Sequence, residues 1–283
     1  MTKSSPAPSR VAPVLLVDTH VHIYDCYDLD ALFDAAARNF AQAAGRLGVS
    51  TAPRQGMLLL TETVNDHYFD ALAAGERSPS RWSVQKTSEP AVLKLACSGQ
   101  SDLWLVAGRQ IATREDLEVL ALGTTERFPD GRPISESLAA VDQSAAMTAL
   151  PWGFGKWWGH RGTIIGQLMA AARDRPLYSG DNGGRLAWST QPQLLKVGEQ
   201  RGHKVLPGTD PLPFPGQELR VATYGILISD WDASRPPLAQ LTARLGLPSE
   251  KPVQFGGLTG LVPFVRLQIA MQLRKRARRG VAA

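Results

Sequence analysis

The stretch VLLVDTHVH, residues 14–22, carries the strongest indication of both fold and function. Its first four residues are apolar and predict a buried strand, which ends in the pair His20 and His22. Because alternate side chains of a strand point to the same side, both imidazoles can reach one metal ion. Two packed or hydrogen-bonded histidines at a strand end are the structural alternative, which this motif alone leaves open.

Short apolar runs alternate with helical patterns along most of the chain, which is typical of βα units around a parallel sheet. We therefore expect an α/β fold, a distorted (β/α) barrel of the TIM type, over residues 11–257. Residues 80–122 predict several strands with little helix between them, so we expect an irregular strand-rich region there. Residues 1–10 are rich in Ser and Pro and predict a disordered N-terminus, and residues 258–283 predict an amphipathic helix with a basic tail.

The charge of the chain lies mainly in its C-terminal tail. The chain has 283 residues and a formal net charge of +5, and residues 274–279 alone hold five of its 31 Lys and Arg residues. The remaining body is neutral, so we predict that nucleic acid is not a partner. The two cysteines are far apart and exclude a disulfide framework. With no secretory signal in the sequence, we expect a cytoplasmic protein.

A carboxylate follows a later strand. The apolar pair Val205 and Leu206 leads into Gly208, Thr209 and Asp210. At the end of a late barrel strand, Asp210 could ligate a metal or take a proton from water. An aspartate that caps a turn is the structural alternative.

The glycine-rich loop 152–162 precedes a predicted helix and carries candidate substrate-binding residues. Lys156 and Arg161 could neutralise a phosphate or carboxylate near the helix N-terminus, and Trp157 offers a flat face to a ring. A rigid loop whose tryptophans fill the core explains the same residues equally well.

Further candidates follow other predicted strands. Asp181 and Arg185 lie in a segment that could face the same site or form a simple glycine-rich turn. His67 could reach the site from beyond the second strand, or lie on an exposed loop. Glu118 alternates with apolar neighbours, and we interpret it as facing solvent.

The order of these motifs resembles the polymerase-and-histidinol-phosphatase (PHP) family of metal-dependent phosphoesterases and, more distantly, the amidohydrolases. The segments that carry the resemblance over residues 14–225 are His20 and His22, Thr61–Glu62–Thr63, Gly108–Arg109–Gln110–Ile111, residues 117–123, Leu150–Pro151–Trp152, and Gly208–Thr209–Asp210–Pro211–Leu212. The family has several metal ligands at these positions. This chain keeps His20, His22 and Asp210, has Glu62 where an Asp would stand, and has Gln110, Trp152 and Leu212 at positions of other ligands.

The resemblance implies a hydrolase with a cluster of two or three metal ions, and the ligands that this chain keeps reduce the expectation to one divalent ion (Zn, Mn or Fe), or none. Its metal ligands would be His20, His22, Asp210 and Glu62, and its catalytic residues Asp210, Glu62 and Lys156. A small anionic substrate, such as a phosphoester, would contact Lys156, Arg161, Asp181, Arg185, Trp157, Gln110 and His67. Two alternatives stay open: a degenerate barrel that binds an anionic or sugar ligand without turnover, and a membrane-surface accessory protein that acts through its basic C-terminal helix.

Overall fold

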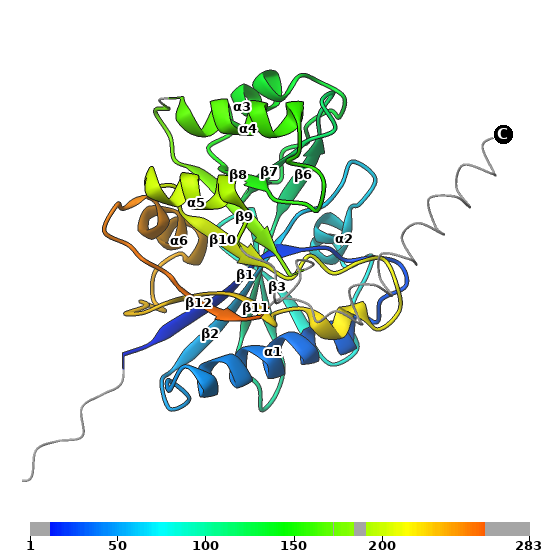
Figure 1. Ribbon diagram of the computed structural model, residues 1–283. Coiled ribbons are helices and arrows are strands. Elements are labelled where there is room, and N and C mark those ends of the chain that lie inside the picture. Colours follow the sequence, from blue (N-terminus) through cyan, green and yellow to red (C-terminus); the bar gives the residue numbers. More distant parts are fainter. Residues whose placement is uncertain (1–11, 172, 184–190, 258–283) are drawn as a thin grey trace, which may run out of the picture.

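The computed structural model describes residues 12–171, 173–183 and 191–257 (Figure 1). Its elements are β1 (Val14–Val21), α1 (Leu29–Arg46), β2 (Arg54–Leu60), α2 (Tyr68–Ala74), β3 (Ser83–Lys86), β4 (Val92–Ala96), β5 (Leu103–Val106), β6 (Gly108–Ala112), β7 (Glu118–Leu122), α3 (Ile134–Gln143), β8 (Met147–Pro151), α4 (His160–Ala170), β9 (Leu177–Asn182), α5 (Gln193–Gln200), β10 (Val205–Gly208), η1 (Gln217–Arg220), β11 (Tyr224–Ile228), α6 (Pro237–Gly246) and β12 (Val253–Gly256).

The strands form two mixed sheets. The larger has seven strands in the order β12-β11-β1-β2-β5-β4-β3, and the smaller has five in the order β10-β9-β8-β7-β6. Parallel pairing joins β1 to β2 and β2 to β5 in the first sheet, and β8 to β9 and β9 to β10 in the second. The remaining neighbours pair antiparallel.

The predicted (β/α) barrel was therefore wrong for the part of the chain that the structure describes. A TIM-type barrel needs eight parallel strands, each followed by a helix. The five strands β3 to β7 instead follow one another without an intervening helix, so most of them pair as antiparallel neighbours. The predicted strand-rich region at residues 80–122 is confirmed, and this region breaks the regular alternation.

Three apolar clusters show that the fold has four layers (Figure 1). The first cluster packs α1 and α2 against the larger sheet, and the third packs α3, α4 and α5 against the smaller one. The middle cluster lies between the sheets and contains residues of both, such as Leu15 of β1 and Leu206 of β10. Burial of strand residues on both faces explains why these strands are continuous apolar runs in the sequence.

The two sheets touch at the strand ends that carry the candidate site. Glu62 and Arg109 form an isolated parallel bridge between the ends of β2 and β6. On the other side, the backbone N–H of Asp210 donates to the carbonyl of His20 at 2.9 Å. Side chains at the ends of β1, β2 and β10 and near the start of β6 are thereby brought together.

A shift in register sets the direction of the two histidines. Pairing of β1 with β2 is irregular between Asp18 and Val21. Before the shift, Leu16 faces α1 and Val17 faces the middle layer, whereas after it Val21 faces the α1 side. An irregularity of this kind reverses which residues point inward. His20 and His22 consequently point toward the space between the sheets.

Several predictions concern the chain ends. Two predictions fall outside the described residues: the disordered N-terminus at residues 1–10, and the C-terminal helix and tail at 258–283. The predicted membrane-surface role rests on that C-terminal helix, so it stays a prediction as well. Among the helices that the structure describes, none combines the length and apolar character needed to cross a bilayer. The cytoplasmic location stays a prediction.

Candidate metal centre

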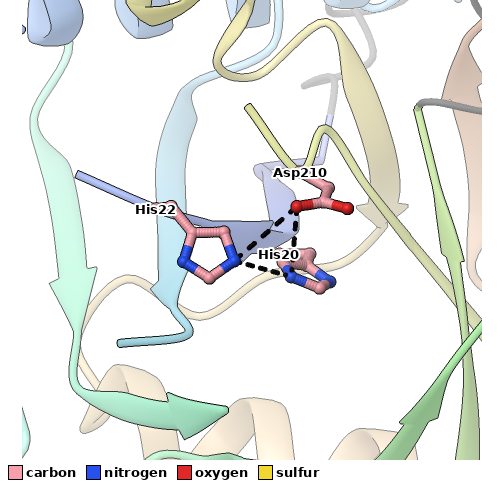
Figure 2. A group of neighbouring side chains, drawn as sticks. All are labelled: His20, His22 and Asp210. Atoms are coloured by element: carbon pink, nitrogen blue, oxygen red, sulfur yellow. Dashed lines mark hydrogen bonds and ion pairs between the residues drawn. The ribbon is translucent and has the colours of Figure 1, made fainter. Parts of the chain in front are cut away.

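Three side chains from two strand ends converge on one point (Figure 2). The Nε2 atoms of His20 and His22 lie 3.1 Å apart. Asp210 Oδ1 lies 3.5 Å from the first of these nitrogens and 3.6 Å from the second. Within the described residues, these three side chains are the group of potential ligands close enough to share a metal ion.

The spacing of these atoms fits a metal ion. Tetrahedral zinc with bonds of about 2.0–2.1 Å keeps its ligand atoms about 3.3–3.4 Å apart. The observed separations of 3.1, 3.5 and 3.6 Å lie on either side of this value. Two imidazoles and one carboxylate are a donor set that suits Zn, Mn or Fe, and three protein ligands leave a position for water or substrate.

The charge states also suit a metal ligand set. Burial, together with the neighbouring His20 ring, lowers the pKa of His22 to about 4 against the opposing pull of Asp210. The His22 ring is therefore neutral at pH 7, which is the form that binds metal. Burial alone would raise the pKa of Asp210, but electrostatic interactions with His20, His22, Lys156 and Arg220 lower it overall. The site thus presents a carboxylate beside a neutral imidazole.

Asp18 fixes the position of these ligands through hydrogen bonds to the backbone that carries them. Its Oδ1 accepts the backbone N–H of Thr209 at 2.9 Å and that of His20 at 3.3 Å. Its Oδ2 accepts the Thr209 hydroxyl and the backbone N–H of Ala222 at 2.8 Å. Burial raises the pKa of Asp18 to about 6, and these hydrogen bonds oppose the rise. One carboxylate thus ties the strand of His20 to the residue before Asp210.

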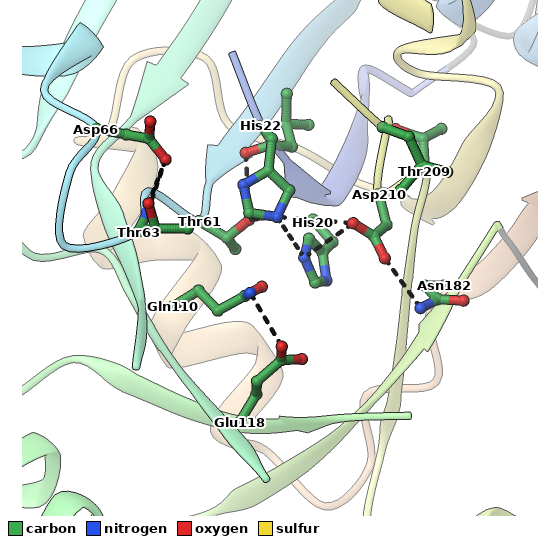
Figure 3. A network of polar contacts seen from close by, with 12 residues as sticks. His20, His22, Thr61, Thr63, Asp66, Gln110, Glu118, Asn182, Thr209 and Asp210 are labelled. Atoms are coloured by element: carbon green, nitrogen blue, oxygen red, sulfur yellow. Dashed lines mark hydrogen bonds and ion pairs between the residues drawn. The ribbon is translucent and has the colours of Figure 1, made fainter. Parts of the chain in front are cut away.

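Two more polar side chains contact the ligands (Figure 3). Asn182, at the end of β9, donates to Asp210 Oδ2 at 3.0 Å and to the carbonyl of Trp152 at 2.9 Å. The Thr61 hydroxyl lies 3.3 Å from His22 Nε2. Asp210 itself has a positive φ of 46°, a conformation that aspartate tolerates better than most residues. Such outer contacts orient the ligands of metal sites.

Glu62 lies at the end of β2, but its carboxylate does not join the three converging ligands. Its Oε2 forms an ion pair with Arg109, and its Oε1 accepts the backbone N–H of Phe69 at 2.7 Å. Both side chains of the ion pair are almost fully buried. Burial raises the pKa of Glu62 to about 7, against the hydrogen bond from Phe69 and the charge of Arg109. The predicted metal ligand is thus in contact with a cation of the chain itself.

A cavity of about 680 Å³ opens beside the ligands. Its lining includes His22, Asp210, Gln110, Lys156 and Glu118. The Glu118 carboxylate forms an ion pair with Lys156 and accepts the side-chain amide of Gln110 at 3.2 Å (Figure 3). Two predicted substrate-binding residues, Lys156 and Gln110, therefore lie at the cavity.

The interpretation of Glu118 as facing solvent was wrong. Val119 and Ala121 pack under the helices, whereas Leu120 and Leu122 pack in the middle layer. Both faces of β7 are therefore covered. Glu118 lies on the same face as Leu120 and Leu122, and its carboxylate lines the cavity.

The structure separates the other predicted substrate-binding residues from the cavity. Trp157 packs in the core under α4, and Arg161 donates to the carbonyl of Gly155 at 2.9 Å within the loop. Asp181 is buried and accepts the hydroxyl of Tyr224 at 2.8 Å. His67 is exposed before α2. Arg185 lies outside the described residues.

Sequence reasoning missed Asp18, Asn182 and Glu118 as site residues. Asp18 sits two residues before His20, and that proximity was the available signal. Asn182 adjoins Asp181, which was chosen because a charged side chain is a more familiar ligand. In β9 the two residues point to opposite faces, and Asn182 is the one that reaches Asp210.

Comparison with known proteins gives a fold likeness. No protein-family model matches the sequence, and no curated protein matches it. The fold is similar to PsfC from Pseudomonas syringae PB-5123, with a TM-score of 0.51, 13% identity and coverage of 94% of this chain and 99% of that one. It is also similar to the lesion-specific endonuclease PfuEndoQ from Pyrococcus furiosus, with a TM-score of 0.53 and 10% identity. That match covers 86% of this chain, which spans 59% of the length of the endonuclease.

Such identities show a likeness of fold alone. The prediction that excluded nucleic acid as a partner was wrong, because an endonuclease shares this fold. A neutral protein body was a poor reason for the exclusion, since binding of a phosphate backbone depends on local charge and on any bound metal ion.

Proposed function

We propose that this protein is a metal-dependent hydrolase that cleaves a phosphoester. The convergence of His20, His22 and Asp210 beside a cavity of about 680 Å³ carries the proposal. A cavity of this size accommodates a small organic substrate or part of a larger one. A divalent ion held by these residues supplies the Lewis acidity that turns water into a nucleophile near neutral pH.

The side chains of the cavity have distinct roles in this proposal. The Nε2 atoms of His20 and His22 and Asp210 Oδ1 would hold the ion. Asn182 keeps Asp210 Oδ2 in place through its hydrogen bond of 3.0 Å, and the Asp210 carboxylate would accept a proton from water. The ammonium of Lys156, which lines the cavity, neutralises the phosphoryl group.

The charge of the cavity supports an order of binding. Four carboxylates line it, those of Asp25, Asp66, Glu118 and Asp210, against the single ammonium of Lys156. Without a cation, such a cavity repels an anionic substrate. We therefore expect a phosphoester to bind only after the divalent ion.

A second candidate function is binding without turnover. Trp152 is buried and Leu212 lines the cavity, at positions where the PHP family has further metal ligands. A site with one ion holds less positive charge at the leaving group than a site with several, and this observation favours a protein that only binds its ligand.

The test is metal content measured by mass spectrometry, followed by hydrolysis of p-nitrophenyl phosphate and bis(p-nitrophenyl) phosphate. The wild type should hold nearly one equivalent of Zn, Mn or Fe and hydrolyse at least one ester, whereas His20→Ala with His22→Ala should do neither. His160→Ala, which removes an exposed histidine, is the matched control. Metal without hydrolysis would favour the second candidate, and no metal after incubation with each ion would refute the proposal.

A further inference from the structure

A second cleft, of about 350 Å³, lies at the amino ends of β9 and β10. The segments that form it are the loop between α4 and β9, the loop between α5 and β10, and the end of α6 (Figure 1). The metal ligands lie at the opposite ends of the strands, since Lys204 precedes β10 and Asp210 follows it. Strand length therefore separates the cleft from the metal centre.

The lining of this cleft is strongly basic. Four residues with fixed positive charge, Arg173, Arg175, Arg201 and Lys204, line it together with one carboxylate, that of Asp174. Arg173 pairs with Asp142. Among the described residues, the other three cations form no ion pair with a carboxylate. The cleft thus carries uncompensated positive charge, in contrast to the acidic cavity beside the metal ligands.

Two of these four cations are held in place by backbone carbonyls. Arg175 donates to the carbonyls of Asp142 and Ala146, and the Lys204 ammonium donates to those of Leu245 and Leu247. Neutral carbonyls orient the cations without cancelling their charge. The walls of the cleft are consequently rigid, and preorganised charge is what a selective ion site requires.

The neighbouring histidine adds to this rigid frame. His203 also lines the cleft, and its ring nitrogens lie 2.7 Å from the carbonyl of Leu177 and 2.9 Å from that of Met169. The ring therefore links the start of β9 to the end of α4. The position of the loop that carries Arg201 is fixed by this contact.

In the part of the chain that the structure describes, one guanidinium at the cleft, that of Arg201, has N–H groups free for a ligand. The exposed side chain of Arg201 has no hydrogen-bond or ion-pair partner among the described residues, although it lines the cleft. The Nε of Arg173 also lacks a hydrogen-bond partner within these residues, but it is buried and contributes only its charge. A guanidinium with free N–H groups matches the oxygens of phosphate, often through two parallel hydrogen bonds.

We propose that this cleft is an anion site for a small molecule with a phosphate group, separate from the metal centre. Arg201 binds the phosphate oxygens, and Arg173, Arg175 and Lys204 supply the surrounding positive charge. A cleft of about 350 Å³ matches a small ligand. We favour this ligand over a nucleic-acid backbone, which follows an open basic surface rather than a cleft.

The experiment is calorimetric titration of the metal-free protein with inorganic pyrophosphate at constant ionic strength. The wild type and the variant His20→Ala with His22→Ala should both bind one equivalent with equal affinity. Arg201→Ala should weaken this binding about 10-fold, because it removes a charged hydrogen-bond donor from an exposed position where folding is unaffected. Lys196→Ala, which removes an exposed positive charge from α5 outside the cleft, should change nothing.

Four results would contradict the proposal. The first is no saturable binding by the wild type, and the second is an equal loss in the Arg201 and Lys196 variants, which would mean unspecific charge attraction. Loss of binding in the His20 and His22 variant would place the anion at the metal centre instead. Displacement of pyrophosphate by a short DNA duplex, but not by a small phosphomonoester, would contradict the choice of ligand. Because the titration uses metal-free protein, its outcome is independent of the proposed hydrolase activity.

Discussion

Two acidic side chains, the buried Glu62 and the partly exposed Asp210, lie at strand ends, and they differ in where their cation comes from. Glu62 has a cation from the chain itself, because Arg109 forms an ion pair with it. The basic side chains within 4.0 Å of Asp210 are instead the rings of His20 and His22, and Asn182 donates a neutral hydrogen bond to it. At Glu62 the arginine of the chain balances the carboxylate charge, and the resulting ion pair joins the two sheets. Where the chain supplies two imidazoles, the converging ring nitrogens and carboxylate oxygen suit a cation from solution.

The largest effect should come from removing the ligands of the Asp210 group. His20→Ala with His22→Ala should abolish metal binding and lower phosphoester hydrolysis by more than about 100-fold, beyond the effect of residues that only support ligands. Metal content and the turnover rate measure the result. Arg109→Met should keep its metal, and if it loses as much as the histidine variant, the distinction between the two groups fails.

Breaking the ion pair of Glu62 with Arg109 should instead lower the stability of the fold and leave metal binding intact. Arg109→Met leaves a buried carboxylate unpaired, which should lower the free energy of unfolding by about 3–5 kcal/mol at pH 8. Since burial already raises the pKa of Glu62 to about 7, the folded state takes up a proton more readily than the unfolded one. Stability of the variant should therefore fall as pH rises from about 4.5 through 7.

Urea denaturation at pH 5 and pH 8 tests this sign. The loss caused by Arg109→Met should be smaller at pH 5, where Glu62 can be neutral. Glu62→Gln combined with Arg109→Met has no titrating group at this position, so its stability should change less between the two pH values. An equal loss for the single variant at both pH values would show that Glu62 remains charged without its partner.

Of these two groups, the sequence could predict the ligands around Asp210 but not the partner of Glu62. Alternation along a strand placed His20 and His22 on one side, and the motif after β10 placed Asp210 at a strand end. The partner of Glu62 was not predictable, because Arg109 lies 47 residues away and meets it only through the junction of the two sheets. Local periodicity carries no information about such a junction.

The fold itself shows the same limit. Most strands were identifiable as apolar runs, including those of the strand-rich region, but their pairing was not. A strand in residues 83–122 can pair parallel in a barrel or antiparallel in a hairpin with the same apolar pattern, and the antiparallel choice gave two sheets. Glu118 was misinterpreted for a related reason, since a strand covered on both faces has no solvent side.

A smaller effect on the metal centre should come from Asp18. Each of its oxygens accepts two hydrogen bonds, so the NH2 group of Asp18→Asn must face two donors in either orientation. We expect metal affinity to fall by about 10- to 100-fold, the range for residues that orient ligands. Competition with a chelator measures it, and Asp232→Asn, at an exposed position, is the control. Unchanged affinity would mean that the ligands hold their geometry without this support.

The smallest effect should come from the ion pair between Lys156 and Glu118. This pair is intermediate between the buried Glu62 group and the Asp210 group, which faces the cavity. Lys156 pairs with Glu118, but 38% and 19% of the two side chains stay exposed at the cavity. A cation of the chain that remains accessible can also contact a substrate, so Lys156→Met should raise the KM for a phosphoester on the order of 10-fold with little change in kcat. Lys196→Met, at an exposed position on α5, is the control. An unchanged KM would show that the ammonium stays with Glu118 throughout, and the pair would then be structural, as Glu62 and Arg109 are.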